Sequence, residues 1–507
     1  MFRITRKQED LETLGFKLLD DLPAWRVRSV EQVELTTAQL SKRERVIHVK
    51  PLREVDSLQY LLRKTVGRGD SATLIIPIVN LPRFILLDFN ITIDGNSAYR
   101  FPRKETGEFE ARYIRHLATE AKLSGEIDGQ LEEFMAAAFT FPGSALEAKL
   151  MSARKKSFDW RADEGDLEEL IRKYVKDDFG PLVSDRTFER WQHRTTQISN
   201  LVRRYTPKNL LSASENPLLA LPQFMRNHNL TSRTVSRMLA RLCRLLTQAH
   251  EFVQLDEIAH PDNTSWARKF MRAYSSYGQR WEVLTKCSVP LNEPFIIQVS
   301  DKRPIFFDPP GRRYSSRWPW LKDRLMPTAR QYVSFADART NHFHIRVPDE
   351  GVEFVPSKCL AMREDYMGPA DKPSDENKEK EHYSRYDAKV NREKRIWIDC
   401  RLRLTRLRLS MFLGLILATL LAVAMMVSYG FICYNDQHKL NGSDVVAILI
   451  PVTFAASLLI VKETTTLTMH VKRAYQAFLM SSLLALWVLT FILYVMGRIS
   501  IDGAVGK

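Results

Sequence analysis

Two histidines in a strand-like segment are the first residues in this sequence that could do chemistry. His342 and His344 flank Phe343, so both imidazoles and Arg346 point to the same face of the predicted strand. Two imidazoles could begin a zinc site, but the sequence offers no third ligand beside them. An exposed polar strand face explains the same pattern, and we therefore predict no metal site here.

Cys243 and His250 form a second pair with chemical potential. They are seven residues apart in a segment predicted to be helical, a spacing that lets both side chains approach one face. Cys243 also lies among Leu239, Leu242 and Leu246. We interpret it as a buried, inert thiol, because apolar surroundings disfavour the reactive thiolate.

The sequence motifs of the common enzyme classes are missing. There is no GxSxG nucleophile elbow, no GxxxxGK[ST] phosphate loop, no GxGxxG after a strand and no HExxH zinc motif. The five cysteines, at positions 243, 287, 359, 400 and 433, form no CxxC pair, which fits a reduced compartment. We predict no catalytic residue, no cofactor and no metal, and hence a protein that is not an enzyme.

A basic stripe in the middle of the chain is the clearest candidate for binding. Arg233, Arg237, Arg241 and Arg244 recur at intervals of three and four residues, so they share one face of a helix. Such a stripe suits phosphates or another anionic partner. The alternative is a solvated face of an amphipathic core helix.

The segment 229–242, NLTSRTVSRMLARL, resembles the turn and recognition helix of helix-turn-helix DNA-binding proteins. In that resemblance Asn229 takes the left-handed turn, and Thr231 or Ser232 caps the following helix. The residues expected on the buried face are Val235, Leu239 and Leu242.

The resemblance covers about 25 of the 507 residues and departs from the family in three ways. Met225 stands where the family has a small residue, Pro222 interrupts the first helix, and no wing-like hairpin follows. DNA binding is therefore an alternative function.

Three apolar stretches near the C-terminus contain no Lys or Arg and predict a membrane anchor. They cover residues 409–434, 445–461 and 474–497. A bilayer core of about 30 Å requires roughly 20 apolar residues in a helix, so the second stretch, which contains Pro451, is at the short limit. We predict three transmembrane helices, with two spans and a re-entrant segment as the alternative.

Basic residues flank these stretches unevenly. Lys462, Lys472 and Arg473 lie between the second and third stretches, whereas only Lys439 lies between the first two. By the positive-inside rule, we expect a cytoplasmic N-terminal part and an external C-terminus in the inner or plasma membrane. An arginine-rich collar at 395–408 is expected to bind anionic headgroups, with about 1 kcal/mol per basic residue. The collar residues predicted to do so are Arg401, Arg403, Arg406 and Arg408.

The soluble part of the chain is long and basic. Its roughly 400 residues are enough for two or three domains with proper cores. The whole chain has 75 Lys and Arg against 60 Asp and Glu, a net charge of +15 that the collar explains only in part. The remaining excess indicates a lipid surface, a nucleic acid or an acidic partner.

Strand-like segments lie on both sides of a helical block. Residues 46–101 and 295–356 contain short β-branched and aromatic runs, whereas residues 107–287 show helical spacing. We interpret the soluble part as an α+β body, in which one antiparallel β-sandwich-like domain is split by a helical insertion. The sequence shows no strand–helix–strand alternation, which is the pattern that would indicate a parallel sheet.

The predicted domains follow from these textures. They are an N-terminal helix with the first half of the β domain at 1–106, the helical insertion at 107–290, the second half of the β domain at 291–363, a charged flexible tether at 364–394 and the basic collar at 395–408, followed by the three spans.

Together these features predict a multi-pass membrane protein whose large cytoplasmic domain senses or binds a protein partner. One alternative is a membrane-disrupting, pore-forming effector, for instance in bacterial defence, triggered by its cytoplasmic domain. Another is a membrane-tethered helix-turn-helix regulator. The partners considered are a bilayer with anionic headgroups, an unidentified protein, a second copy of the chain and a nucleic acid. A transporter is disfavoured, because the spans carry no charged residue that would mark a transport path.

Overall fold

The computed structural model describes most of the chain between Arg6 and Ser500. The residues outside the described part are 1–5, 83–86, 125–126, 142–175, 177–178, 180–182, 206–212, 260–264, 279, 306, 308–324, 336, 356–359, 364–373, 378–379, 388–393, 437–439, 442, 444, 447–448, 451–452, 455–456, 458–465, 497–498 and 501–507.

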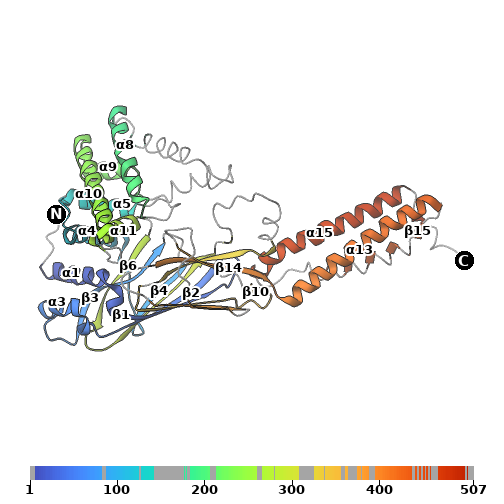
Figure 1. The fold of residues 1–507 in the computed structure, drawn as a ribbon, viewed down its shortest axis with the longest axis horizontal. Coiled ribbons are helices and arrows are strands. Elements are labelled where there is room, and N and C mark those ends of the chain that lie inside the picture. Colours follow the sequence, from blue (N-terminus) through green and yellow to red (C-terminus); the bar gives the residue numbers. More distant parts are fainter. Residues whose placement is uncertain are drawn as a thin grey trace.

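An eight-stranded sheet is the centre of a mixed α+β body (Figure 1). Its order is β12-β13-β9-β1-β2-β7-β4-β5. The strands are β1 (Arg26–Glu34), β2 (Leu40–Val49), β4 (Leu87–Ile93), β5 (Asn96–Ser97), β7 (Phe295–Pro304), β9 (Thr340–Arg346), β12 (Ser374–Asn377) and β13 (Glu381–Asp387). Strands that precede and follow the helical block therefore pair with one another, as β2 does with β7.

The pairing within this sheet is not purely antiparallel. β1 and β9 run parallel, with Glu31 opposite Phe343, whereas the other described pairs are antiparallel. The antiparallel arrangement expected from the sequence is therefore corrected to a mixed sheet. A parallel pair needs a crossover connection, and here the whole helical block lies between the two strands.

Three smaller sheets complete the strands of the described part. One contains β14 (Lys394–Leu404), paired with β8 (Thr328–Phe335), β10 (Val352–Phe354) and β11 (Leu360–Arg363). The others are β3 (Ser71–Pro82) with β6 (Arg280–Pro290), and β15 (Leu440–Asn441) with β16 (Ile499–Ser500).

Helices cover one end of the body and form the helical block. At the end of the large sheet lie α1 (Arg6–Asp20), α2 (Leu22–Trp25), the short 3-10 helix η1 (Leu52–Glu54) and α3 (Asp56–Val66). The block contains α4 (Arg103–Glu120), α5 (Gly129–Thr140), α8 (Asp185–Val202), η3 (Pro217–Leu219), α9 (Leu221–His228), α10 (Ser232–Ala259) and α11 (Trp266–Ser276). Its core is aromatic and aliphatic, with Phe109, Trp191, Leu239 and Phe270 buried together.

Two helices, α13 (Arg406–Asp436) and α15 (Thr466–Val495), are long and apolar enough to cross a membrane. Both begin at the body and extend from it side by side (Figure 1). β15 follows α13 and β16 follows α15, and the two strands pair in parallel, so the far ends of the helices lie together. Much of the predicted second span lies outside the described residues, but Val445 and Leu449 pack against both helices.

The segment expected to be a flexible tether contributes strands to the large sheet. β13 pairs with β9 and places Glu381 opposite Arg346, and β12 pairs with β13. The expectation rested on a high content of charged residues. An antiparallel hairpin near a sheet edge can carry such residues, because one of its faces meets water.

Candidate functional site

The base of the two apolar helices is continuous with the core of the body. One buried cluster joins side chains of the strands to side chains of the helices. Its members from the strands and the turn after β1 include Val33, Leu35, Phe343, Ile345, Phe354, Leu402 and Leu404, and its helix members are Phe412, Leu467, Val471, Tyr475, Leu479 and Leu483. The helices are therefore built into the core of the folded body at their body-side ends.

α13 is joined to the body through the backbone. Thr405 is the one residue between the end of β14 and the start of α13. Its backbone N–H donates to Gly351 O at 3.1 Å, and its carbonyl accepts from Leu409 N at 2.9 Å. The last strand of the smaller sheet thus passes directly into the helix.

α15 is held at its N-terminus by a side chain from a distant loop. Asp349, which is 7% exposed, follows β9 and accepts the Thr468 N–H at 2.9 Å and the Thr468 hydroxyl at 2.7 Å. Thr468 is the third residue of α15, where a backbone N–H has no partner inside the helix. Asp349 therefore caps α15, and its negative charge lies at the positive end of the helix dipole.

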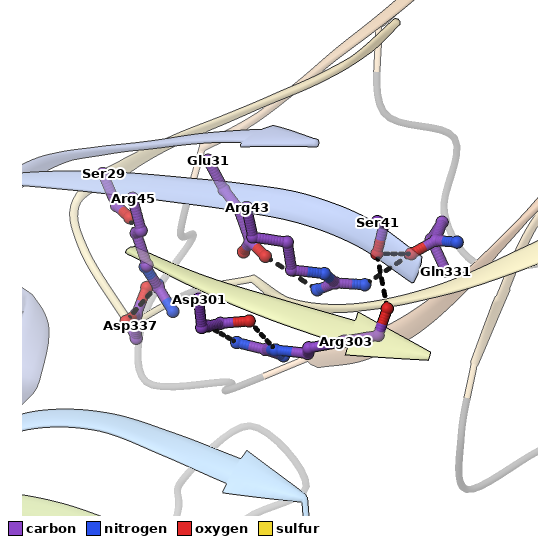
Figure 2. A network of polar contacts seen from close by, with 9 residues as sticks. All are labelled: Ser29, Glu31, Ser41, Arg43, Arg45, Asp301, Arg303, Gln331 and Asp337. Carbon is purple, nitrogen blue, oxygen red and sulfur yellow. Dashed lines mark hydrogen bonds and ion pairs between the residues drawn. The ribbon is translucent and has the colours of Figure 1, made fainter. Parts of the chain in front are cut away.

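A second polar feature lies on one face of the large sheet, where buried charged and polar side chains form what we call the charge layer (Figure 2). Its residues are Ser29, Glu31, Ser41, Arg43, Arg45, Asp301, Arg303, Gln331 and Asp337. All nine are buried, and they come from β1, β2, β7, β8 and the connection before β9.

Arg43 is the centre of the charge layer. Its Nη1 donates to Glu31 Oε1 at 2.9 Å, and its Nη2 donates to Gln331 Oε1 at 2.7 Å. Burial lowers the pKa of Arg43 to about 10, and the neighbouring Arg303 acts in the same direction, while Glu31 and Asp301 oppose both. The side chain is still a cation at neutral pH, so the layer contains a real buried charge.

The remaining arginines of the layer are also paired. Arg303 forms a two-point contact with Asp301 at 2.7 and 2.8 Å. Asp337 accepts from Arg45 and, at 2.9 Å, from Arg26, whose second terminal nitrogen donates to Pro77 O at 2.7 Å. Arg26 therefore connects β1 to β3 and to the connection before β9.

The charge layer separates two apolar regions of the same sheet face. On one side lie Ile47, Ile297 and their neighbours, covered by α1, α3 and β3. On the other side lie the residues of the helix base, including Val33 and Ile345. Paired buried charges add little net stability, but they penalise any arrangement that separates the partners. The layer can therefore fix how the parts of the body fit together.

The predicted basic stripe lies on α10. Arg233, Arg237, Arg241 and Arg244 are all exposed, as the spacing requires. Arg241 forms an ion pair with Asp128, which caps α5 through Leu131 N at 2.9 Å. One of the four cations thus has a partner within the block.

The turn before α10 has the predicted local geometry. Asn229 has φ 49° and ψ 45°, in the left-handed region. Thr231 accepts the Thr234 N–H at 3.3 Å, which makes it the cap. The predicted buried face is confirmed, since Val235, Leu239 and Leu242 are fully buried. Pro222 does not interrupt a longer first helix, because it lies in the first turn of the eight-residue α9.

The predicted headgroup-binding arginines lie at the start of α13 and on β14. Arg403 forms an ion pair with Glu353 at 2.7 Å, and Arg401 lies partly buried on β14. Arg406 is exposed at the first position of α13, and Arg408 is partly buried two residues later. The collar is therefore partly engaged with the protein itself.

In the described part of the chain, neither histidine-containing pair belongs to a group of three or more potential metal ligands. His342 contacts the Tyr383 hydroxyl, and His344 lies 3.8 Å from Glu381. His250 contacts Tyr205 at 2.7 Å, and the pKa of Cys243 is raised by burial.

No sequence motif indicated the cluster around Asp20. His116 Nε2 and Lys17 Nζ lie 3.1 and 3.2 Å from its carboxylate, and Tyr113 donates to it at 3.2 Å. Burial alone would raise the pKa of Asp20, but the hydrogen bond and charge of His116, with Lys17 and Lys269, lower it overall. The cluster joins α1 to α4 and α11.

A comparison with protein families, curated proteins and solved structures finds no match to this chain.

Proposed function

We propose that this chain is a multi-pass membrane protein whose α+β body senses or binds a partner on the cytoplasmic side. In this proposal α13 and α15 hold the body at the bilayer. The body acts by binding and by conformational change, without catalytic chemistry of its own.

One observation carries the proposal: α13 and α15 are built into the body's core at one end and carry exposed large apolar side chains along the rest. Leu417, Leu484, Trp487 and Phe491 are 52 to 66% exposed. Such a surface on two long helices requires apolar surroundings, and a bilayer core provides them over roughly 20 residues of each helix.

The arrangement of the helix ends supports three spans. Both α13 and α15 begin at the body, so the chain has to return to the body between them. Arg406 and Arg473 are exposed near the body-side ends of α13 and α15, whereas the outer parts of both helices lack basic residues. By the positive-inside rule, this distribution supports a cytoplasmic body and an external C-terminus.

Reporter fusions at Lys439 and Lys507 test the topology. We expect both positions to report the external side and a fusion at the N-terminus to report the cytoplasm. A cytoplasmic signal at Lys507 together with an external signal at Lys439 would leave two spans. A protein released from membranes by carbonate at high pH would contradict the anchor altogether.

A pull-down of the full chain from detergent extract, with mass spectrometry of proteins, nucleotides and nucleic acids, tests the binding role. We expect a specific protein partner that is lost when the body is unfolded. The pore-forming alternative predicts instead that the purified chain releases dye from liposomes once it assembles.

DNA binding is the second candidate, and the left-handed turn at Asn229 with the exposed stripe on α10 favours it. If Arg233, Arg237 and Arg244 contact phosphates, changing all three to Ala should lower DNA affinity and reduce the salt slope by about one unit per lost contact. A wild-type chain without measurable DNA affinity would remove this candidate. Lys64→Ala, on the distant α3, is the charge control.

A further inference from the structure

The two apolar helices are attached to the body in different ways. α13 continues the backbone of β14 through Thr405, so its first turn moves with that strand. The start of α15 is held by side-chain hydrogen bonds and packing from other parts of the body. The attachment of α15 is therefore the one that can open without breaking a strand.

Among the described residues, two connections of the large sheet supply hydrogen bonds to the first turn of α15, beside the packing of its apolar side chains in the shared cluster. Asp349, in the connection after β9, accepts from Thr468 and also from Gly351 N at 2.8 Å. The turn between β1 and β2 contributes Ala38 N, which donates to Thr466 Oγ1 at 3.0 Å. The two connections follow the neighbouring parallel strands β1 and β9, so they lie at the same end of the sheet.

Gly351 makes the close approach possible. A Cβ at this position would overlap the Thr468 hydroxyl and lie 2.7 Å from Arg408 Nη1. The backbone of residue 351 thus lies between the first turns of α13 and α15, and it also accepts the Thr405 N–H. Loop 348–351 is in contact with the starts of both helices.

We propose that loop 348–351 is a latch that couples the large sheet to the N-terminus of α15. When the Asp349–Thr468 contact is closed, α15 is fixed to the end of β9. When it opens, α15 can tilt relative to α13, which stays continuous with β14. A movement of β1 and β9 thereby reaches the start of α15 through side-chain contacts, whereas α13 follows β14 through the backbone.

The latch follows from the contacts at the helix base and does not depend on where the helices reside. It adds to the proposed function a route by which binding at the body could reach the helices. Opening of the latch would expose backbone amides to exchange with solvent. The latch can therefore be tested in detergent as well as in lipid.

The variant Thr468→Val of the full-length chain tests the latch, and the measurement is hydrogen exchange with mass spectrometry. This variant removes the hydroxyl and keeps the backbone N–H. We expect exchange in peptides covering 466–473 and 347–353 to become about fivefold faster, a change of the size that the loss of one hydrogen bond produces. Peptides covering 399–410 and 476–495 should be unchanged.

Thr490→Val is the matched control, because the Thr490 hydroxyl donates to Leu486 O within α15 at 2.8 Å. It should leave exchange at 347–353 and 466–473 unchanged. Gly351→Ala opens the latch by a different route and should accelerate the same two regions. Unchanged exchange in both latch variants, or an equal acceleration at 399–410 in Thr468→Val, would overturn the proposal.

Discussion

At the scale of single residues, the most unusual feature of this protein is a set of arginines inside a β-sheet. Arg43 and Arg303 lie on neighbouring strands and are both buried, and each keeps a carboxylate within hydrogen-bonding distance. Buried ion pairs are sensitive to the loss of one partner, because the other charge then has neither water nor a counter-ion. The charge layer should therefore respond strongly to single substitutions.

Glu31→Gln tests this sensitivity. We expect the variant to lose about 3–5 kcal/mol of stability, since Arg43 stays charged and buried without its carboxylate. The double variant Glu31→Leu/Arg43→Met should recover much of the loss, because no unpaired charge remains. The measurement is thermal unfolding of the full chain in detergent, followed by near-ultraviolet circular dichroism.

The matched control is Glu34→Gln in the same strand. Glu34 pairs with Arg346, whose side chain is 51% exposed, so the loss should be no more than about 1 kcal/mol. Equal effects of the two substitutions would show that the charge layer has no special role in stability.

Asp20 gives a prediction about pH. Its pKa in the folded protein lies below the ordinary value of 3.8, so its contribution to stability is complete above that value. The contribution is lost as the pH falls from 3.8 through the folded pKa. Asp20→Asn should therefore be less stable than the wild type at pH 7, and the difference should shrink below pH 3.8.

Thermal unfolding between acid and neutral pH measures this effect. Asp10→Asn is the control, because Asp10 lies on the same helix and pairs with Lys64 at the surface. A difference between Asp20→Asn and the wild type that does not change with pH would contradict the assignment.

At the scale of elements, β14 decides how the helices join the body. It pairs with β8, β10 and β11 and then passes through Thr405 into α13. The smaller sheet therefore depends on residues that follow the segment expected to be a tether.

Truncation tests the role of β14. A chain that ends at Glu364 lacks β12, β13 and β14, and we expect it to aggregate because β8, β10 and β11 lose their shared partner. A chain that ends at Thr405 keeps these strands and should stay monodisperse in detergent on gel filtration. A soluble, folded chain ending at Glu364 would show that the body does not need β14.

At the scale of the whole molecule, the helices and the body share one buried cluster. If the helices lie in a bilayer, Trp487 should contact acyl chains, since it is 52% exposed on α15. Brominated lipids in nanodiscs should quench its fluorescence, and Trp487→Phe should reduce the quenched fraction. Trp191→Phe is the control, because Trp191 is buried in the helical block. Unchanged quenching in Trp487→Phe would place α15 outside the lipid.

The sequence by itself determined the features that depend on neighbouring residues. The long apolar stretches predicted α13 and α15, because a continuous apolar run of about 20 residues is long enough for a helix that spans a bilayer. The left-handed turn at Asn229 and the buried face of α10 followed from local preference and helical spacing.

Only the tertiary structure decided which charges are buried and where chain segments meet. Arg43 and Gln331 are 288 residues apart, and Asp349 and Thr468 are 119 apart. Nothing in the alternation of polar residues around Arg43 distinguishes a buried charge from a solvated one, because its partners lie on distant strands. The same reason explains the parallel pair of β1 and β9 and the strands within 364–394: strand pairing depends on contacts between distant segments, which local composition does not record.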